Sequence, residues 1–191
     1  MTILILNASP RPRGIISQML GIIRDEAERR GATVEVERVQ QLSLRPCMGC
    51  MKCRSSHQCV LPQDDAQRIL RLIDQCDALI IGAPCYWGNM PGTLKLLFDR
   101  IVYGMMGETP KGFPKPLHKG KRAVVVTSCT TPWPFNILYN QSRGVVRALR
   151  EILGWSGFKM VATIQRGGTR SHPTLTDKDR RKCLRVVDKL I

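Results

Sequence analysis

Apolar residues along the chain follow two periods. Five short runs rich in β-branched residues and Leu predict β-strands, at Thr2–Leu6, Thr33–Val39, Ala78–Ile81, Ala123–Thr127 and Met160–Ile164. Between them, apolar residues recur every three or four positions and predict helices around Ile16–Ala27, Ile69–Ile73, Leu94–Ile101, Asn136–Leu153 and Cys183–Leu190. Gln40–Pro62 and Met105–Gly120 show neither period, so we expect a long loop and an exposed excursion there.

The strict alternation of strands and helices predicts an α/β fold, a doubly wound parallel sheet with helices on both faces. Five strands favour the flavodoxin-like order 2-1-3-4-5. At 191 residues, we expect one domain, residues 1–191, with a cysteine-rich loop at about 40–63. This order brings the loops after the first, third and fourth strands to one edge of the sheet, where ligands bind; they are Ser9–Ser17, Pro84–Gly92 and Ser128–Trp133.

Charge is distributed unevenly along the chain. Of the formal net charge of +15, residues 101–191 carry +12. Such an excess favours a phosphate-bearing cofactor, an acidic protein or nucleic acid, or it is simply a solvated basic face. No nucleic-acid-binding motif accompanies the charge, so we do not expect nucleic acid as a partner.

Composition also bears on location. No apolar run approaches the roughly 20 residues of a membrane span, and the first residues lack the features of a signal peptide. We therefore expect a cytoplasmic protein without a membrane partner. Its eight cysteines are then expected as thiols or metal ligands and not as disulfides.

The loop after the first strand reads SPRPRGIIS and leads into a helix N-terminus. Unpaired N–H groups and the helix dipole make such a position an anion site. The hydroxyls of Ser9 and Ser17 and the charges of Arg11 and Arg13 suit phosphate. The loop is neither GxGxxG nor a P-loop, and the alternative is a capped helix with two solvent-facing arginines.

The loop after the third strand lies within GAPCYWGNMPGTLKLLFDR. Tyr86 and Trp87 offer flat apolar faces, while Gly88, Gly92 and the prolines let the backbone approach a planar molecule closely. The alternative is an ordinary joint whose aromatic side chains fill the core.

Four cysteines, Cys47, Cys50, Cys53 and Cys59, follow a C-x2-C-x2-C-x5-C spacing. Thiolates this close can converge on an iron–sulfur cluster. A zinc site and unligated thiols are the alternatives. No histidine has a serine or cysteine partner that would indicate hydrolase chemistry.

Three segments together carry a family resemblance: SPR after the first strand, CMGCMKCRSSHQC with a following DD, and PCYWGNMPGTLKLLFDR. The chain resembles flavodoxin-fold NADPH-dependent FMN reductases, especially the iron–sulfur flavoproteins. The resemblance implies that the first loop holds the FMN phosphate, the second lies against the ring and the third closes the ring's polar edge. The implied cofactor-binding residues are Ser9, Arg11, Arg13, Ser17, Gln18, Pro84, Cys85, Tyr86, Trp87, Gly88, Asn89, Met90, Ser128, Cys129, Thr130 and Thr131.

The resemblance also implies a [4Fe–4S] cluster on Cys47, Cys50, Cys53 and Cys59. One departure concerns the phosphate loop, where Ile15-Ile16 replaces the Asn-Thr that the family often has. The loss of two polar groups leaves the phosphate to backbone amides and Ser17. Cys85 and Cys129 lie in the proposed flavin loops, where they either line the site or pack as small apolar residues.

We therefore expect an FMN-dependent oxidoreductase that accepts hydride from NADPH or NADH and passes electrons to a quinone, metal or protein acceptor. No catalytic side chain is expected, because the flavin supplies the chemistry. The alternatives are a flavoprotein electron carrier or redox sensor, and a basic nucleic-acid-binding module. The resemblance further implies a homodimer or homotetramer, with Met105–Gly120 as a candidate contact.

Overall fold

A parallel sheet of five strands forms the centre of the protein in the computed structural model, which describes all of residues 1–191. The strands are β1 (Thr2–Asn7), β2 (Thr33–Arg38), β3 (Ala78–Pro84), β6 (Arg122–Ser128) and β7 (Lys159–Arg166). Their order β2-β1-β3-β6-β7 is 2-1-3-4-5 when these five alone are counted, which confirms the predicted flavodoxin-like sheet. The central β3 is buried along nearly its whole length, as its apolar run requires.

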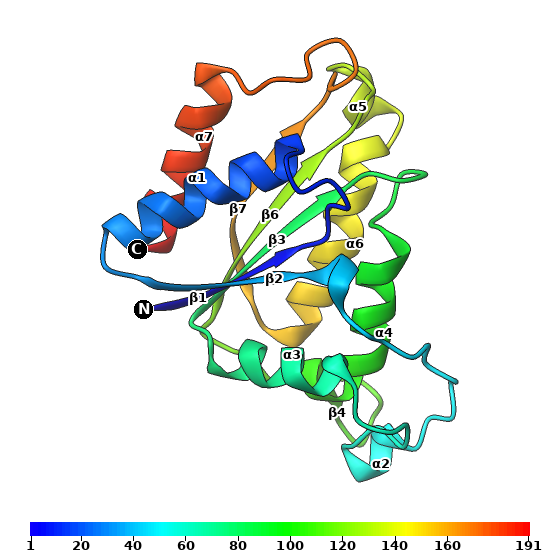
Figure 1. Ribbon diagram of the computed structural model, residues 1–191. Helices are drawn as coiled ribbons and strands as arrows, with labels where there is room; N and C mark the ends of the chain where they lie inside the picture. Colours follow the sequence, from blue (N-terminus) through cyan, green and yellow to red (C-terminus); the bar gives the residue numbers. More distant parts are fainter.

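Helices cover both faces of this sheet (Figure 1). The helices α1 (Ile15–Arg29) and α7 (Asp177–Leu190) pack on one face, and α3 (Asp65–Gln75), α4 (Gly92–Met105) and α6 (Gln141–Ser156) pack on the other. Alternate strand residues supply the two cores: Ile3 and Ile5 pack with α1 and α7, whereas Leu4 and Leu6 pack with α3 and α4. None of the helices combines the length and apolarity required to span a bilayer.

The predicted helix Asn136–Leu153 is wrong at its start. The structure has a short helix α5 (Phe135–Leu138), a break, and then α6. Asn140 forms the break with a φ of 56°, a left-handed conformation that Asn adopts more readily than most residues. The apolar period continues across the break, so the sequence pattern alone does not reveal it.

The two segments without a period contain short elements. Met105–Gly120 includes an antiparallel hairpin of β4 (Met106–Glu108) and β5 (Pro114–Pro116). The long loop begins with a single 3-10 turn, η1 (Val39–Gln41), and includes one helical turn, α2 (Cys53–Ser56). Elements of three or four residues are too short to show a period.

Candidate functional site

The loops after β1, β3 and β6 meet at the carboxyl ends of the strands, as the topology predicts. Together with the loop after β7, they enclose a cavity of about 340 Å³, which we call the edge cavity. Its lining contains one cation, Arg11, and no carboxylate, so it suits an anionic or neutral ligand. The lining residues are Ser9, Pro10, Arg11, Ile15, Ile16, Pro84, Cys85, Tyr86, Ser128, Cys129, Thr130, Thr169 and Pro173.

The first wall of the edge cavity is the turn that leads into α1. Ser9 is buried; its N–H donates to Asn7 Oδ1 at 3.0 Å, and its hydroxyl oxygen accepts from the Arg11 N–H at 3.3 Å. Gly14 is the N-cap of α1 and offers no side-chain acceptor to the first turn. The N–H groups at this helix end are therefore free to bind an anion beside Ile15 and Ile16.

Three residues predicted to bind the cofactor phosphate do not line the edge cavity. The Ser17 hydroxyl donates to the Arg11 carbonyl at 2.9 Å and accepts from Asn7 Nδ2 at 3.0 Å. Gln18 Nε2 donates to the Arg13 carbonyl at 2.8 Å. These bonds tie the turn to α1, so Ser17 and Gln18 brace the loop in this structure, and neither they nor Arg13 reach the cavity.

The second wall is a tight hairpin after β3. Tyr86 and Asn89 exchange two backbone hydrogen bonds of 2.9 Å around Trp87 and Gly88, whose φ angles are 52° and 70°. Positive φ at both central residues is typical of a type I′ turn and is strained for Trp. Within this segment only Tyr86 lines the cavity; Trp87 is fully exposed and Met90 is buried in the core.

Helix α6 holds this hairpin in place through a contact between two glycines. A Cβ atom at Gly144, in the first turn of α6, would lie 1.9 Å from the Gly88 carbonyl oxygen. A side chain at position 144 would therefore push the hairpin away. The absence of a side chain at Gly144 lets the helix and the second wall pack in direct contact.

The third wall combines the loops after β6 and β7. Ser128, Cys129 and Thr130, which the sequence predicted, line the cavity. Thr131 does not, and its carbonyl accepts from the Gly168 N–H at 2.8 Å. Thr169 was not predicted, yet it lines the cavity and its N–H and hydroxyl donate to the Cys129 carbonyl at 3.1 and 3.0 Å.

The sequence also contains the information that places Thr169 and Pro173 at this edge of the sheet. They follow the fifth strand, and the carboxyl ends of all parallel strands lie at the same edge. The loop after the fifth strand therefore belongs to the same edge as the other three.

Two thiols, Cys85 and Cys129, lie side by side at the ends of β3 and β6, where the Cys85 N–H donates to the Ser128 carbonyl at 2.9 Å. Burial raises the pKa of both thiols above the ordinary value. Both are therefore protonated at neutral pH and line the cavity as neutral groups.

A second cavity, of about 260 Å³, lies between residues 47–61 and the C-terminal half of α4; we call it the cysteine cavity. All four cysteines of the C-x2-C-x2-C-x5-C motif line it, together with Asp99, Arg100 and Tyr103 of α4. Burial, followed by the neighbouring thiols Cys47, Cys59 and Cys50, raises the pKa of Cys53. No three His, Cys, Asp or Glu side chains stand in an arrangement that could hold a metal ion, so the motif forms a common cavity but not a preformed metal site.

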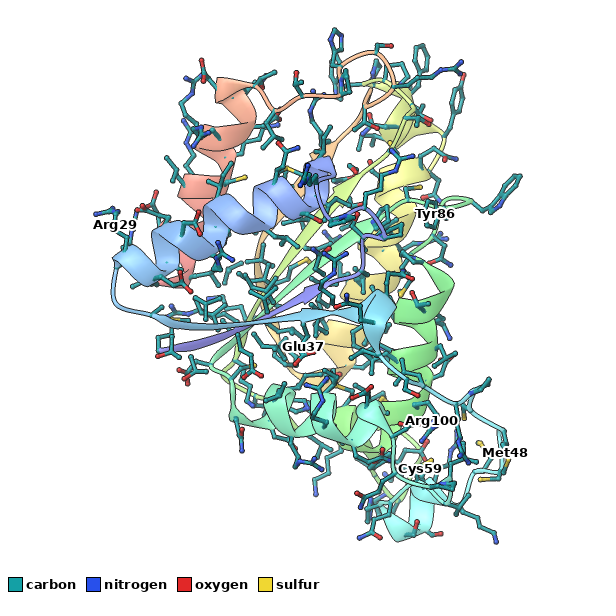
Figure 2. The ribbon with its side chains drawn as sticks, viewed as in Figure 1. Arg29, Glu37, Met48, Cys59, Tyr86 and Arg100 are labelled. Atoms are coloured by element: carbon teal, nitrogen blue, oxygen red, sulfur yellow. The ribbon has the colours of Figure 1, made fainter.

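Arg100 is the most unusual residue of the cysteine cavity. It is 2% exposed, and its Nη1 donates to Asp64 Oδ2 at 2.7 Å and to the Arg45 carbonyl at 2.8 Å. Its Nε and Nη2 are buried without a hydrogen-bond partner. Figure 2 shows Arg100 beside the loop that carries Met48 and Cys59, at the far end of α4 from Tyr86.

A family model described as NADPH-dependent FMN reductase matches residues 1–172. An iron-sulfur flavoprotein of Archaeoglobus fulgidus is 32% identical over 107 residues, which are 56% of this chain and 52% of the relative. An FMN-dependent NADH:quinone oxidoreductase of Haemophilus influenzae is 30% identical over 108 residues, 54% of this chain and 50% of the relative.

The chain thus spans about half the length of the curated relatives it matches. A solved structure covers nearly all of it. The FMN-dependent NADH-azoreductase of Bacillus anthracis, determined in complex with FMN, aligns with 98% of this chain and 95% of that chain at a TM-score of 0.74 and 14% identity. At that identity the likeness shows the fold.

Proposed function

The chain belongs to the NADPH-dependent FMN reductase family, and from this premise we propose that it is an oxidoreductase that binds FMN in the edge cavity. In this proposal NADPH or NADH is the electron donor and a quinone, metal or protein is the acceptor. The observation that carries the proposal is the closure of four loops around one cavity, without a carboxylate, against an uncapped helix N-terminus. The FMN phosphate is an anion that such a helix end suits.

Each wall has a role in holding the cofactor. Ser9, Arg11 and the first N–H groups of α1 would hold the phosphate. Because Ile15 and Ile16 stand at this turn, the phosphate would depend on backbone donors more than on side chains. Tyr86 would lie against the ring, and Ser128, Thr130 and Thr169 would offer hydroxyls at its polar edge. When bound, FMN supplies the electron transfer, and the protein orients the cofactor and controls access to it.

The cysteine cavity adds a second proposed site. Its four thiols suit a [4Fe–4S] cluster or a structural zinc ion. The name iron-sulfur flavoprotein, which several curated relatives carry, supports the first of these. The unpartnered Arg100 donors in the same cavity fit a group that accepts hydrogen bonds, such as a metal-bound thiolate or a sulfide. A metal centre there is part of the proposal.

The assembly and location also belong to the proposal. Trp87, Trp133, Leu138 and Tyr139 are well exposed on the loops and short helix near the edge cavity, which supports a homodimer or homotetramer that covers them. Light scattering tests this, and a monomer mass would contradict it. Eight free thiols suit a reducing compartment, so we propose a cytoplasmic location.

The proposed function is tested by titrating the purified protein with FMN and then measuring NADPH and NADH oxidation with a quinone. We expect quenching of FMN fluorescence on binding and oxidation that requires both FMN and the quinone. Binding without oxidation would indicate an electron carrier or sensor. Failure to bind FMN would overturn the proposal.

A further inference from the structure

The guanidinium of Arg100 is buried, and two of its three nitrogens have no hydrogen-bond partner in the protein. Asp64 and the Arg45 carbonyl both accept from Nη1, so Nε and Nη2 stay unpaired. Arginine donors in a protein interior almost always find an acceptor, because an unpaired buried donor has lost its water without compensation. An acceptor is therefore expected in the cavity that Arg100 lines.

The carboxylates of the cysteine cavity are already paired with other cations. Asp99 pairs with Lys95, and Glu108 lies 3.4 Å from Arg54. Asp64 also accepts from the N–H groups of Ala66 and Arg45 while it holds Arg100. Apart from the Tyr103 hydroxyl, the His57 ring and backbone carbonyls, none of which is paired with Nε or Nη2, the remaining acceptors that line the cavity are the four cysteine sulfurs.

Neutral thiols are weak acceptors, whereas metal-bound thiolates are strong ones because they are deprotonated. A zinc ion or an iron–sulfur core held by four thiolates carries a net negative charge in either case. Each thiol gives its proton to solvent when the metal binds. Both centres thus share one chemistry, an anionic tetrathiolate that accepts hydrogen bonds.

We propose that Arg100 is the hydrogen-bond donor and counter-charge of an anionic metal centre held by Cys47, Cys50, Cys53 and Cys59, and that it sets the stability and reduction potential of that centre. The inference rests on the metal centre of the proposed function but not on FMN. Hydrogen bonds and net charge near the sulfurs are among the factors that determine the potential of such clusters. Arg100 is a positioning residue here and takes no part in electron transfer itself.

Four variants test this role. Arg100→Gln removes the charge, and Arg100→Lys keeps it. Asp64→Asn removes the opposing charge while preserving the cap of α3, since Asn is as good an N-cap as Asp. Arg71→Gln removes an exposed arginine from α3 and is the matched control.

The readouts are metal content after anaerobic reconstitution, circular dichroism for folding and, for a cluster, its midpoint potential by redox titration. We expect Arg100→Gln to lower the potential and Asp64→Asn to raise it, each by about tenfold in the redox equilibrium, or about 59 mV for one electron. Arg100→Lys should recover most of the wild-type value, and Arg71→Gln should leave it unchanged. For a zinc centre, the same variants should lower and raise zinc retention against a chelator.

Shifts of the same sign for Arg100→Gln and Asp64→Asn, or no shift in folded variants, would overturn the proposal. If Arg100→Gln does not fold, the sign of the Asp64→Asn shift alone decides. A wild-type protein that takes up neither iron nor zinc also overturns it. FMN binding is measured on the same samples, so the failure of this inference is distinct from the failure of the FMN site.

Discussion

The edge cavity and the cysteine cavity are built in opposite ways. The edge cavity is assembled from four separate parts of the chain, joined by sheet hydrogen bonds that continue into its loops, such as Cys129 N–H to the Arg166 carbonyl at 3.0 Å. The cysteine cavity has one wall on α4 and the residues after it, and the other wall is one continuous segment, 47–61, whose backbone hydrogen bonds all lie within the segment. The first is therefore preorganised, whereas the second has walls that its occupant must help to order.

Helix α4 connects the two cavities. Its first turn follows the hairpin of the edge cavity, and its last turns carry Arg100 and Tyr103 of the cysteine cavity. Fourteen residues make a helix about 20 Å long, and Figure 1 shows the two loops at opposite ends of it. The two sites are thus separate in structure, which predicts that each can be lost without the other.

The largest expected effect is the loss of the metal centre in Cys53→Ser or Cys59→Ser. Each removes one of the four proposed ligands, so we expect metal content to fall to near zero. The FMN dissociation constant should stay within about twofold of the wild-type value, because the edge cavity is distant. Metal analysis and FMN titration on one preparation check this.

The matched control for the cysteine variants is Cys76→Ala, which removes a buried thiol from the core near the start of β3 and should keep both cofactors. If FMN binding falls together with the metal in Cys53→Ser but not in Cys76→Ala, the two cavities are coupled and the comparison above is wrong.

The converse variant is Gly144→Ala, which should damage the edge cavity alone. The new Cβ would lie 1.9 Å from the Gly88 carbonyl oxygen and must displace the hairpin. We expect a destabilisation of about 1–3 kcal/mol and weaker FMN binding, with metal content unchanged. Chemical unfolding and FMN titration measure the two effects.

Gly154→Ala, on the same helix, is the control for Gly144→Ala. A Cβ at Gly154 meets nothing within 4 Å, so Ala should stabilise α6 by up to about 1 kcal/mol and leave FMN binding alone. Equal behaviour of the two variants would show that the contact between Gly144 and Gly88 does not matter.

The smallest expected effect is on FMN affinity and concerns the first wall of the edge cavity. Ser9→Ala removes a hydroxyl that lines the cavity, and we expect FMN affinity to fall by about tenfold, or roughly 1.4 kcal/mol. Ser17→Ala removes only a brace of the Arg11 carbonyl and should cost less than about threefold in affinity. Isothermal titration with FMN distinguishes them, and the reverse ranking would place the phosphate on the Ser17 side.

The architecture could be predicted from the sequence because the central strands β1, β3 and β6 are nearly uniform apolar runs and the long helices show a clear period. The meeting of the loops after β1, β3 and β6 followed from the strand order. The direction of side chains within a loop did not: Ser17 is the third residue of α1, and a rotation of about 100° per residue turns it away from the cavity that Ile15 and Ile16 line.

The burial of Arg100 could also be predicted from the sequence. It follows Leu97 by three positions, so it lies on the apolar face of α4, where a charged residue must be buried with partners. Its proximity to the cysteines, however, depends on the path of residues 47–61, and no sequence period determines that path.

One carboxylate links the cysteine cavity to the stability of the whole fold. Asp64 caps α3 and at the same time holds Arg100. A centre that binds only the folded chain adds its binding free energy to that of folding, about 2.7 kcal/mol at a free concentration one hundred times the dissociation constant. If the proposed centre is present, metal supply in the cell would then help to determine how long the chain survives proteolysis.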